Sequence, residues 1–343
     1  MNTPTLRAAI LGSLGALAFA GAAAAEWKPS GPINIIVPWG AGGSTDQITR
    51  VTAPIISEEL GVSVVVVNQP GASGAIGTQE VLNKPRDGLT WTANAIANNA
   101  TYSVSGLLEG AHIDDWHIYL SVANAPLISV PADSEFQDFG QLLEAFRERG
   151  AEITVATAGV TSSGGTAIAG LADAGGFKYR MVAYDGGGPA AIATAAGEAM
   201  VTTQLAVEQT ELVRGGRLRA LAVMSDQPLV VEGVDPIPPV TEWLEIPLAP
   251  DYFGIFIPRG VPDEVVAEMD RIWAERVMTS EDIKTYAETF GAVFAPSFGD
   301  EARALAMPIV IHEACSSVER GEAVNPPSSI GIDCETMSEV ATQ

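Results

Sequence analysis

Short apolar runs that suit β-strands alternate with longer helical patterns along most of this chain, and this alternation restricts the fold more than any other feature. Strand-like runs at residues 34–37, 62–67 and 90–93 are separated by helical patterns at about 45–60 and 74–82. Strand–helix–strand repetition is typical of parallel sheets whose strands are joined by crossover helices. The sequence therefore predicts an α/β fold.

The same pattern restarts in the middle of the chain. Further strand-like runs, separated mainly by helical patterns, occur at 127–130, 153–156, 179–183, 199–203, 218–224 and 252–257. A Pro-rich stretch at 236–250 precedes the last run, and a helical pattern that begins at Pro262 follows it. A chain of this length exceeds the size at which one hydrophobic core usually stops growing. We therefore expect two lobes, with the chain crossing from the first to the second and back.

The first 25 residues have the pattern of a cleaved secretory signal. Arg7 supplies a short positive start, residues 8–22 are uncharged and mostly Ala, Leu and Gly, and residues 23–25 are the small residues that a signal peptidase needs. The apolar run is too short and too rich in Ala for a membrane anchor, and no Cys follows it for lipid attachment. We expect this segment to be removed on export.

Charge and cysteine content narrow the classes of function. The formal net charge is −24, which excludes nucleic-acid binding as a default because phosphate would be repelled. The two cysteines, Cys315 and Cys334, are expected to form a disulfide clasp in an oxidising compartment, the alternative being two free thiols. Neither they nor His112, His117 and His312 have the spacing of metal ligands, so we expect no metal and no cofactor.

A Gly-rich loop at residues 38–46 is the strongest local feature. It follows a strand-like run and opens a helical pattern, and its glycines allow the backbone to approach a ligand closely. The unpaired N–H groups at a helix start, together with the helix dipole, favour an anion such as a carboxylate. An ordinary strand-to-helix turn is the alternative. The loop has no Lys for a P-loop and lacks the glycine spacing of a dinucleotide site.

Two similar loops occur in the second half of the chain. Residues 156–166 and 184–189 also follow strand-like runs and lead into helical patterns. Gly-rich loops at strand ends in two lobes indicate one ligand cleft between the lobes. Ser162 and Ser163 lack a nucleophile elbow and a nearby base, so a serine hydrolase is only a minor alternative and we expect no catalytic residues.

Four segments carry a resemblance to a known family. They are PWGAGGSTD at 38–46, NQPGASGAIG at 68–77, DGLT at 87–90 and GRLRALAV at 216–223. From about residue 32 to 296 the chain resembles the substrate-binding receptors of tripartite tricarboxylate transporters, the Bug family, with Trp39 where Phe is usual.

The resemblance implies a type II-like periplasmic-binding-protein (Venus flytrap) fold in a Gram-negative periplasm, with no enzymatic activity. We place the signal peptide at 1–25, lobe 1 at 26–124 and 251–314, lobe 2 at 125–250, and a C-terminal extension at 315–343. The receptor would act as a monomer and deliver a small carboxylate to the large and small membrane subunits of its permease.

The resemblance also implies that main-chain N–H groups of the first two loops hold a ligand carboxylate. Three departures, at Gly165, Asp185 and Gln204, leave the rest of the ligand open: a di- or tricarboxylate, an aromatic acid or an acidic amino acid. A sensor receptor for a signalling kinase is an alternative function. The candidate ligand-binding residues are Trp39, Gly40, Ala41, Gly42, Gly43, Ser44, Thr45, Asp46, Asn94, Ala158, Gly159, Val160, Thr161, Ser162, Ser163, Tyr184, Asp185 and Gln204.

Overall fold

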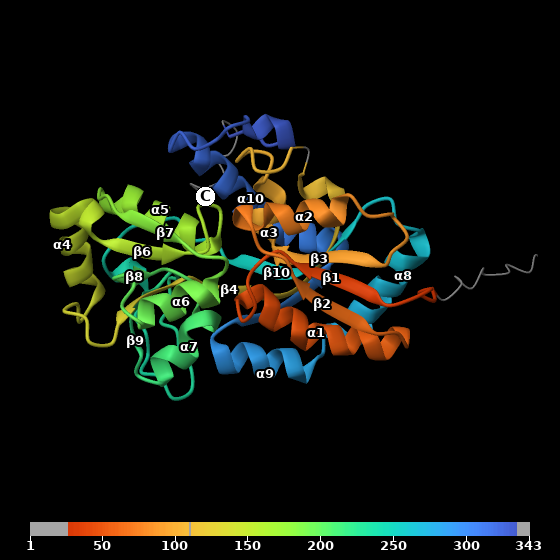
Figure 1. Cartoon of the computed structure of the whole chain (residues 1–343), viewed down its shortest axis with the longest axis horizontal. Helices are drawn as coiled ribbons and strands as arrows, with labels where there is room; N and C mark the ends of the chain where they lie inside the picture. The colour runs from red at the N-terminus through yellow and green to blue at the C-terminus, as the bar shows by residue number, and fades with distance from the viewer. Residues whose placement is uncertain (1–26, 110, 335–343) are drawn as a thin grey trace, which may run out of the picture.

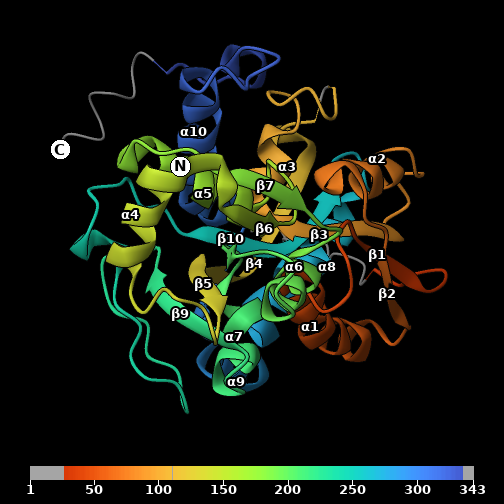
Figure 2. The same cartoon turned by 60° about the vertical axis from the view of Figure 1, so that its left-hand side comes forward.

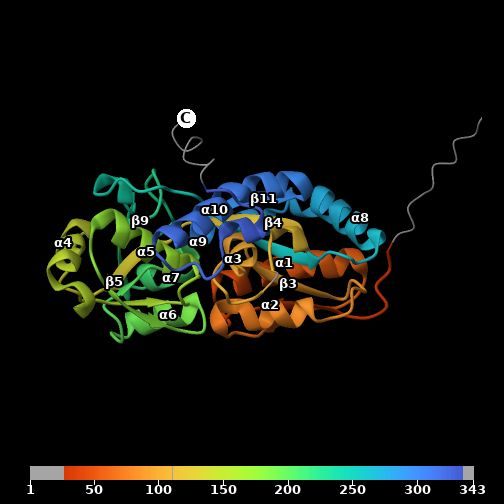
Figure 3. The same ribbon diagram turned by 90° about the horizontal axis from the view of Figure 1, so that it is seen from above.

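Two β-sheets, each covered by helices, form two lobes that lie side by side along the long axis of the molecule (Figures 1 and 3). The structure is a computed structural model that describes residues 27–109 and 111–334. The predicted α/β fold with two lobes is confirmed. The predicted signal peptide at 1–25 lies outside the described residues.

The first lobe contains a mixed sheet with strand order β11-β4-β10-β3-β1-β2. Its strands are β1 (Ile33–Val37), β2 (Val64–Asn68), β3 (Thr90–Ala95), β4 (Trp116–Asn124), β10 (Asp251–Pro258) and β11 (Val293–Phe298). Its helices are α1 (Ser44–Leu60), α2 (Ala75–Leu82), α3 (Ile96–Thr101), α8 (Asp263–Ile272), α9 (Glu281–Phe290) and α10 (Gly299–Glu319). A π-helical turn, Trp273–Val277, continues α8.

The second lobe contains a sheet with strand order β7-β6-β8-β5-β9. Its strands are β5 (Leu127–Pro131), β6 (Thr154–Thr157), β7 (Arg180–Ala183), β8 (Val201–Thr202) and β9 (Leu218–Val223). Its helices are α4 (Phe139–Arg149), α5 (Ser163–Gly175), α6 (Gly187–Ala195) and α7 (Ala206–Arg214).

The parallel pairing expected from the strand–helix–strand pattern is found in part of each sheet. β1 pairs in parallel with β2 and β3, and β6 with β7 and β8, but β10 is antiparallel to both β3 and β4, and β5 is antiparallel to β8 and β9. The chain leaves the first sheet along β4 and returns to it along β10. Strands that carry the chain out of a lobe and back into it run in opposite directions, which makes both sheets mixed.

The strand before the first loop is covered on both faces, which explains why its apolar run does not alternate. Ile33, Ile35 and Val37 are fully buried in the cluster that contains α1, whereas Ile36 packs in the cluster that contains α2 and α10. A strand buried on both faces is typical of parallel sheets covered by helices. This packing fixes the point at which β1 ends and the loop into α1 begins.

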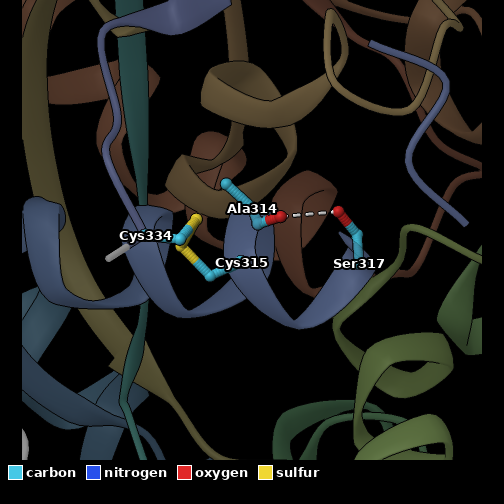
Figure 4. Close-up of a disulfide and its surroundings, with 4 residues drawn as sticks. All are labelled: Ala314, Cys315, Ser317 and Cys334. Atoms are coloured by element: carbon cyan, nitrogen blue, oxygen red, sulfur yellow. Dashed lines mark hydrogen bonds between the residues drawn. A yellow bond between two sulfur atoms is a disulfide. The ribbon is translucent and has the colours of Figure 1, made fainter. Parts of the chain in front are cut away.

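The end of the described chain is tied to the first lobe. A disulfide joins Cys315 in α10 to Cys334 (Figure 4). Between them, the N–H groups of Val324 and Asn325 donate to the carbonyl of Val104 at 2.8 and 3.1 Å. Helix α10 packs beside α3 (Figure 2) and continues past residue 314, so we propose that the whole helix belongs to lobe 1. No helix in the described part of the chain is long and apolar enough to cross a membrane.

A buried carboxyl group links the lobes at the start of β10. Asp251 is 5% exposed, and its Oδ2 accepts a 2.6 Å hydrogen bond from the hydroxyl of Ser163 in α5. Burial raises the pKa of Asp251 to about 6, although the hydrogen bonds from Ser163 and from backbone N–H groups partly oppose this. Burial and the nearby charge of Asp251 also raise the pKa of Glu313, in α10, to about 7.

Removal of the disulfide should destabilise the protein. The bond closes a loop across a sequence separation of 19, and in the chain-entropy model a loop of this size contributes about 3 kcal/mol. Urea unfolding with and without reductant should show this loss, and a variant with both Cys315→Ser and Cys334→Ser should be insensitive to reductant. An unchanged urea midpoint after full reduction would contradict the prediction.

Asp251 should make the stability of the protein depend on pH. Its pKa is higher in the folded protein than the ordinary value of 3.8, so the folded state holds the proton between pH 4 and about 6 while the unfolded state releases it. The free energy of unfolding of the wild type, relative to Asp251→Asn, should therefore fall as pH rises through this window. It should keep falling up to about pH 7, because Asp251→Asn also removes the charge that helps to raise the pKa of Glu313. Urea unfolding at several pH values measures this difference.

Ser163→Ala is the matched control for this experiment, because it removes the hydrogen bond and keeps the buried carboxyl group. The pH dependence should persist in that variant. If the difference between the wild type and Asp251→Asn stays constant from pH 4 to 7, the carboxyl of Asp251 does not titrate as stated.

Candidate functional site

The three Gly-rich loops meet between the lobes. The first connects β1 to α1, the second connects β6 to α5, and the third connects β7 to α6. The N–H of Gly40 in the first loop donates to the carbonyl of Asp185 in the third at 2.7 Å, so these two loops touch backbone to backbone across the interface.

A small cavity lies at the meeting point. Its volume is about 20 Å³, which is room for about one water molecule. A ligand of several non-hydrogen atoms can therefore enter only if the lobes separate. The lining residues are Trp39, Gly43, Ser44, Thr45, Asn98, Ala158, Ser162, Ser163, Gly187, Gln204, Leu205, Glu208 and Phe253.

Asp46 anchors the first loop from behind. Its carboxylate accepts hydrogen bonds from the Gly42 N–H, from Arg50 Nε and from Asn68 Nδ2, each at 2.9 Å. Burial opposes ionisation of Asp46, but these hydrogen bonds outweigh it and hold its pKa below the usual range. Asp46 is among the predicted ligand residues, and its contacts within the protein fix the shape of the loop. It is not among the residues that line the cavity, nor are Gly40, Ala41 and Gly42.

Asn94 holds the indole ring of Trp39 in the cavity wall. Its Oδ1 accepts from Trp39 Nε1 at 2.7 Å, and its Nδ2 donates to Asn99 Oδ1 at 2.9 Å and to the Tyr102 hydroxyl at 3.1 Å. All four side chains are almost completely buried. Asn94 was also predicted as a ligand residue, and the structure places it behind Trp39.

The hydroxyls of Ser162 and Ser163 in the second loop are already hydrogen-bonded within the protein, whereas the buried hydroxyl of Thr161 has no hydrogen-bond partner among the described residues. Ser162 caps α5 by accepting from the Gly165 N–H at 3.1 Å, and it donates to the carbonyl of Gly159 at 2.8 Å. A Cβ at position 165 would lie 2.1 Å from the Gly159 carbonyl oxygen, so the glycine there is required by the close packing of this loop. Ser163 donates to Asp251.

The cavity is not lined by the other predicted residues of the second and third loops, which are Gly159, Val160, Thr161, Tyr184 and Asp185. The side chain of Val160 is exposed, the carbonyl of Thr161 accepts a hydrogen bond from Asn98 of the first lobe, and the Tyr184 hydroxyl contacts Glu198 at 3.3 Å. The backbone carbonyl of Asp185 accepts the hydrogen bond from the Gly40 N–H in the first loop. Of the eighteen predicted ligand residues, the cavity brings together Trp39, Gly43, Ser44, Thr45, Ala158, Ser162, Ser163 and Gln204.

Gln204 connects the second loop to α7. When its amide is oriented to satisfy both neighbours, its oxygen accepts from the Ala158 N–H at 3.0 Å and its nitrogen donates to Glu208 Oε2 at 3.3 Å.

Five residues that line the cavity were not among the predicted ligand residues: Asn98, Gly187, Leu205, Glu208 and Phe253. Glu208 had a detectable signal, since an acid at the third position of a helix often caps the helix start. Gly187 lies in the third Gly-rich loop, which the sequence did indicate, and the other three gave no local signal.

The cavity offers hydrogen-bonding groups and one acid, Glu208, whose pKa is raised by burial although the N–H groups of Ser44 and Leu205 partly oppose this. None of the described residues that line it is Lys, Arg or His. A bound anion would therefore be held by N–H, hydroxyl and amide groups. Within residues 27–109 and 111–334, no cluster of His, Cys, Asp and Glu side chains is placed to hold a metal ion.

Comparisons with known structures show the fold. BugD, titled a periplasmic binding protein, superposes with a TM-score of 0.78 at 22% identity and covers 86% of this chain and 99% of its own. Rpa4515 of R. palustris, solved with adipate, superposes with a TM-score of 0.76 at 22% identity and covers 85% of this chain and 98% of its own. MatC from Rhodopseudomonas palustris, with bound malate, superposes with a TM-score of 0.74 at 20% identity and covers 88% of this chain and 99% of its own. The predicted periplasmic-binding-protein fold is confirmed.

Sequence comparison shows the family. The UPF0065 protein in the tcbD-tcbE intergenic region of Pseudomonas sp. strain P51 is 32% identical over 247 residues, which is 71% of this chain and 72% of that protein. Residues 48–297 match the family described as the tripartite tricarboxylate transporter family receptor. This match covers most of the chain and includes both lobes, and the chain therefore belongs to the receptor family of tripartite tricarboxylate transporters.

Proposed function

We propose that this chain is a periplasmic receptor that captures a small carboxylate between its lobes and delivers it to a tripartite tricarboxylate-type permease. The observation that carries the proposal is the convergence of two helix starts on one cavity. α1 begins at Ser44 and α5 at Ser163, and both residues line the cavity. Helix starts favour anions through their free N–H groups and their dipoles.

The polar groups of the cavity suit a carboxylate. Ser44, Thr45, Asn98 and Gln204 provide hydroxyl and amide groups, whereas Trp39 and Phe253 provide an apolar wall. Hydrogen bonds to a charged group contribute about 1.5–3 kcal/mol each, so several such donors are sufficient to hold an anion without an ion pair. The apolar wall favours a ligand with a hydrocarbon or planar body, such as a dicarboxylate or an aromatic acid.

Two structures of the same fold support this ligand class. One holds adipate and the other malate, and both ligands are dicarboxylates. The acidic composition of the chain does not oppose it, because exposed charges beyond about 8–10 Å are largely screened at physiological ionic strength. Hydrogen bonds at contact distance then decide the affinity.

The proposal includes binding without chemistry. The Ser162 and Ser163 hydroxyls are engaged with Gly159 and Asp251, and the cavity presents no described His or Lys that would serve as their base. It also includes export by the signal at 1–25 and action as a monomer.

Titration calorimetry with free acids tests the ligand class. Adipate, malate, citrate, benzoate and glutamate form the test set, and dimethyl adipate is the matched uncharged control. At least one free acid should bind, and the diester should bind at least about tenfold more weakly than adipate because it lacks the charge that strengthens each hydrogen bond. Binding of dimethyl adipate alone, or of none of the free acids, would overturn the proposal.

A further inference from the structure

Glu208, in α7 of the second lobe, reaches across the interface to the start of α1 in the first lobe. Its Oε1 accepts a 2.8 Å hydrogen bond from the N–H of Ser44, the first residue of α1. Its Oε2 accepts from the N–H of Leu205 at 3.1 Å, and the amide nitrogen of Gln204 lies 3.3 Å from the same oxygen. Three donors from two lobes thus surround one carboxylate.

Two glycines make room for this carboxylate. A Cβ at Gly187 in the third loop would lie 2.0 Å from Glu208 Oε2, and a Cβ at Gly43 in the first loop would lie 3.3 Å from Oε1. The carboxylate is therefore packed between the backbones of both loops.

α1 needs an acceptor from outside its own loop. Its N-cap residue is Gly43, which has no side chain to accept a hydrogen bond from the first turn, and Ser44 is 4% exposed. A buried N–H without a partner is costly, so an acceptor at this position is strongly favoured. In this structure the acceptor is Glu208, and a ligand carboxylate has the same geometry and charge.

We propose that Glu208 is a built-in competitor of the ligand: its carboxylate occupies the donors at the start of α1 and holds the lobes together, and a carboxylate that enters when the lobes separate takes its place on those donors. The ligand class in this inference rests on the proposed function, whereas the effect on the lobes does not. The residue sets the affinity threshold of the receptor: a ligand binds only if its own contacts outweigh those of Glu208.

If Glu208 served only to cap α7, Glu208→Gln would change neither the contact between the lobes nor the affinity for adipate. Glu208 also caps α7 through the Leu205 N–H, a role that Gln fills as well as Glu. In Glu208→Gln the single amide oxygen can keep the cap, and the amide nitrogen then faces the Ser44 N–H, donor against donor. This variant separates the interlobe contact from the cap, and Glu208→Ala removes both.

The experiment combines small-angle X-ray scattering of the ligand-free protein with calorimetric titration of adipate. In Glu208→Gln and Glu208→Ala the radius of gyration should increase, because the lobes lose a contact. The apparent Kd for adipate should fall about tenfold, the change expected when one charge-assisted hydrogen bond to a competing carboxylate is removed. Glu211→Gln is the control, since it removes a charge from an exposed position of the same helix, and it should change neither quantity.

Ser44→Pro tests the same contact from the other lobe. Proline is tolerated at the first position of a helix and has no N–H, and Gly43 has the extended conformation that a following proline requires. The ligand-free lobes should separate as in the Glu208 variants, but adipate affinity should not rise, because the ligand loses the same donor.

The possible failures are distinguishable. An unchanged radius of gyration in both Glu208 variants, or an adipate affinity that is equal to or weaker than that of the wild type, overturns the competitor role. If neither the wild type nor any variant binds a carboxylate, the proposed function fails, and the scattering comparison still decides whether Glu208 holds the lobes together.

Discussion

The backbone N–H groups at the start of α1 have no side-chain cap within their own loop, and much of the site follows from this. The loop must be Gly-rich to turn directly from β1 into α1 at the interface, and Gly43 at the N-cap position offers no acceptor. A buried N–H left unpaired costs about 1–3 kcal/mol. When the lobes are together, the acceptor comes from across the cleft, which couples contact between the lobes to the presence of a carboxylate at this point.

The surrounding network makes that helix start rigid. Asp46 ties the first loop to Arg50 and to Asn68 at the end of β2, and Asn94 fixes the indole of Trp39 from β3. Asp46, Asn94 and Trp39 are buried, Asn68 is half-buried and Arg50 is exposed, and all of them are hydrogen-bonded to one another or to the backbone. A site held by rigid strand ends keeps its donors in place while the lobes move, which is the arrangement that a receptor with separable lobes requires.

A second group of contacts joins the lobes at the start of β10. There Asp251 pairs with Ser163, and Glu313 lies close enough to Asp251 for its charge to raise the pKa of Glu313. The C-terminal segment, clasped by Cys315 and Cys334, packs against the first lobe beside this region. Glu208 and Asp251 thus place one buried acid on each side of the interface, and each receives a hydrogen bond from the opposite lobe.

The sequence by itself determined the α/β class, the two lobes and the three loops, because the periods of strands and helices and the glycines at strand ends are local properties. It did not determine the strand directions, which depend on how β4 and β10 connect the lobes. It placed Asp46 and Asn94 among the ligand residues, and only the tertiary structure assigned them to Arg50, Asn68 and Trp39. Glu208 lies 164 positions from Ser44, and no local pattern reports a contact over that distance. Which donors meet across the cleft is decided when two independently formed lobes come together.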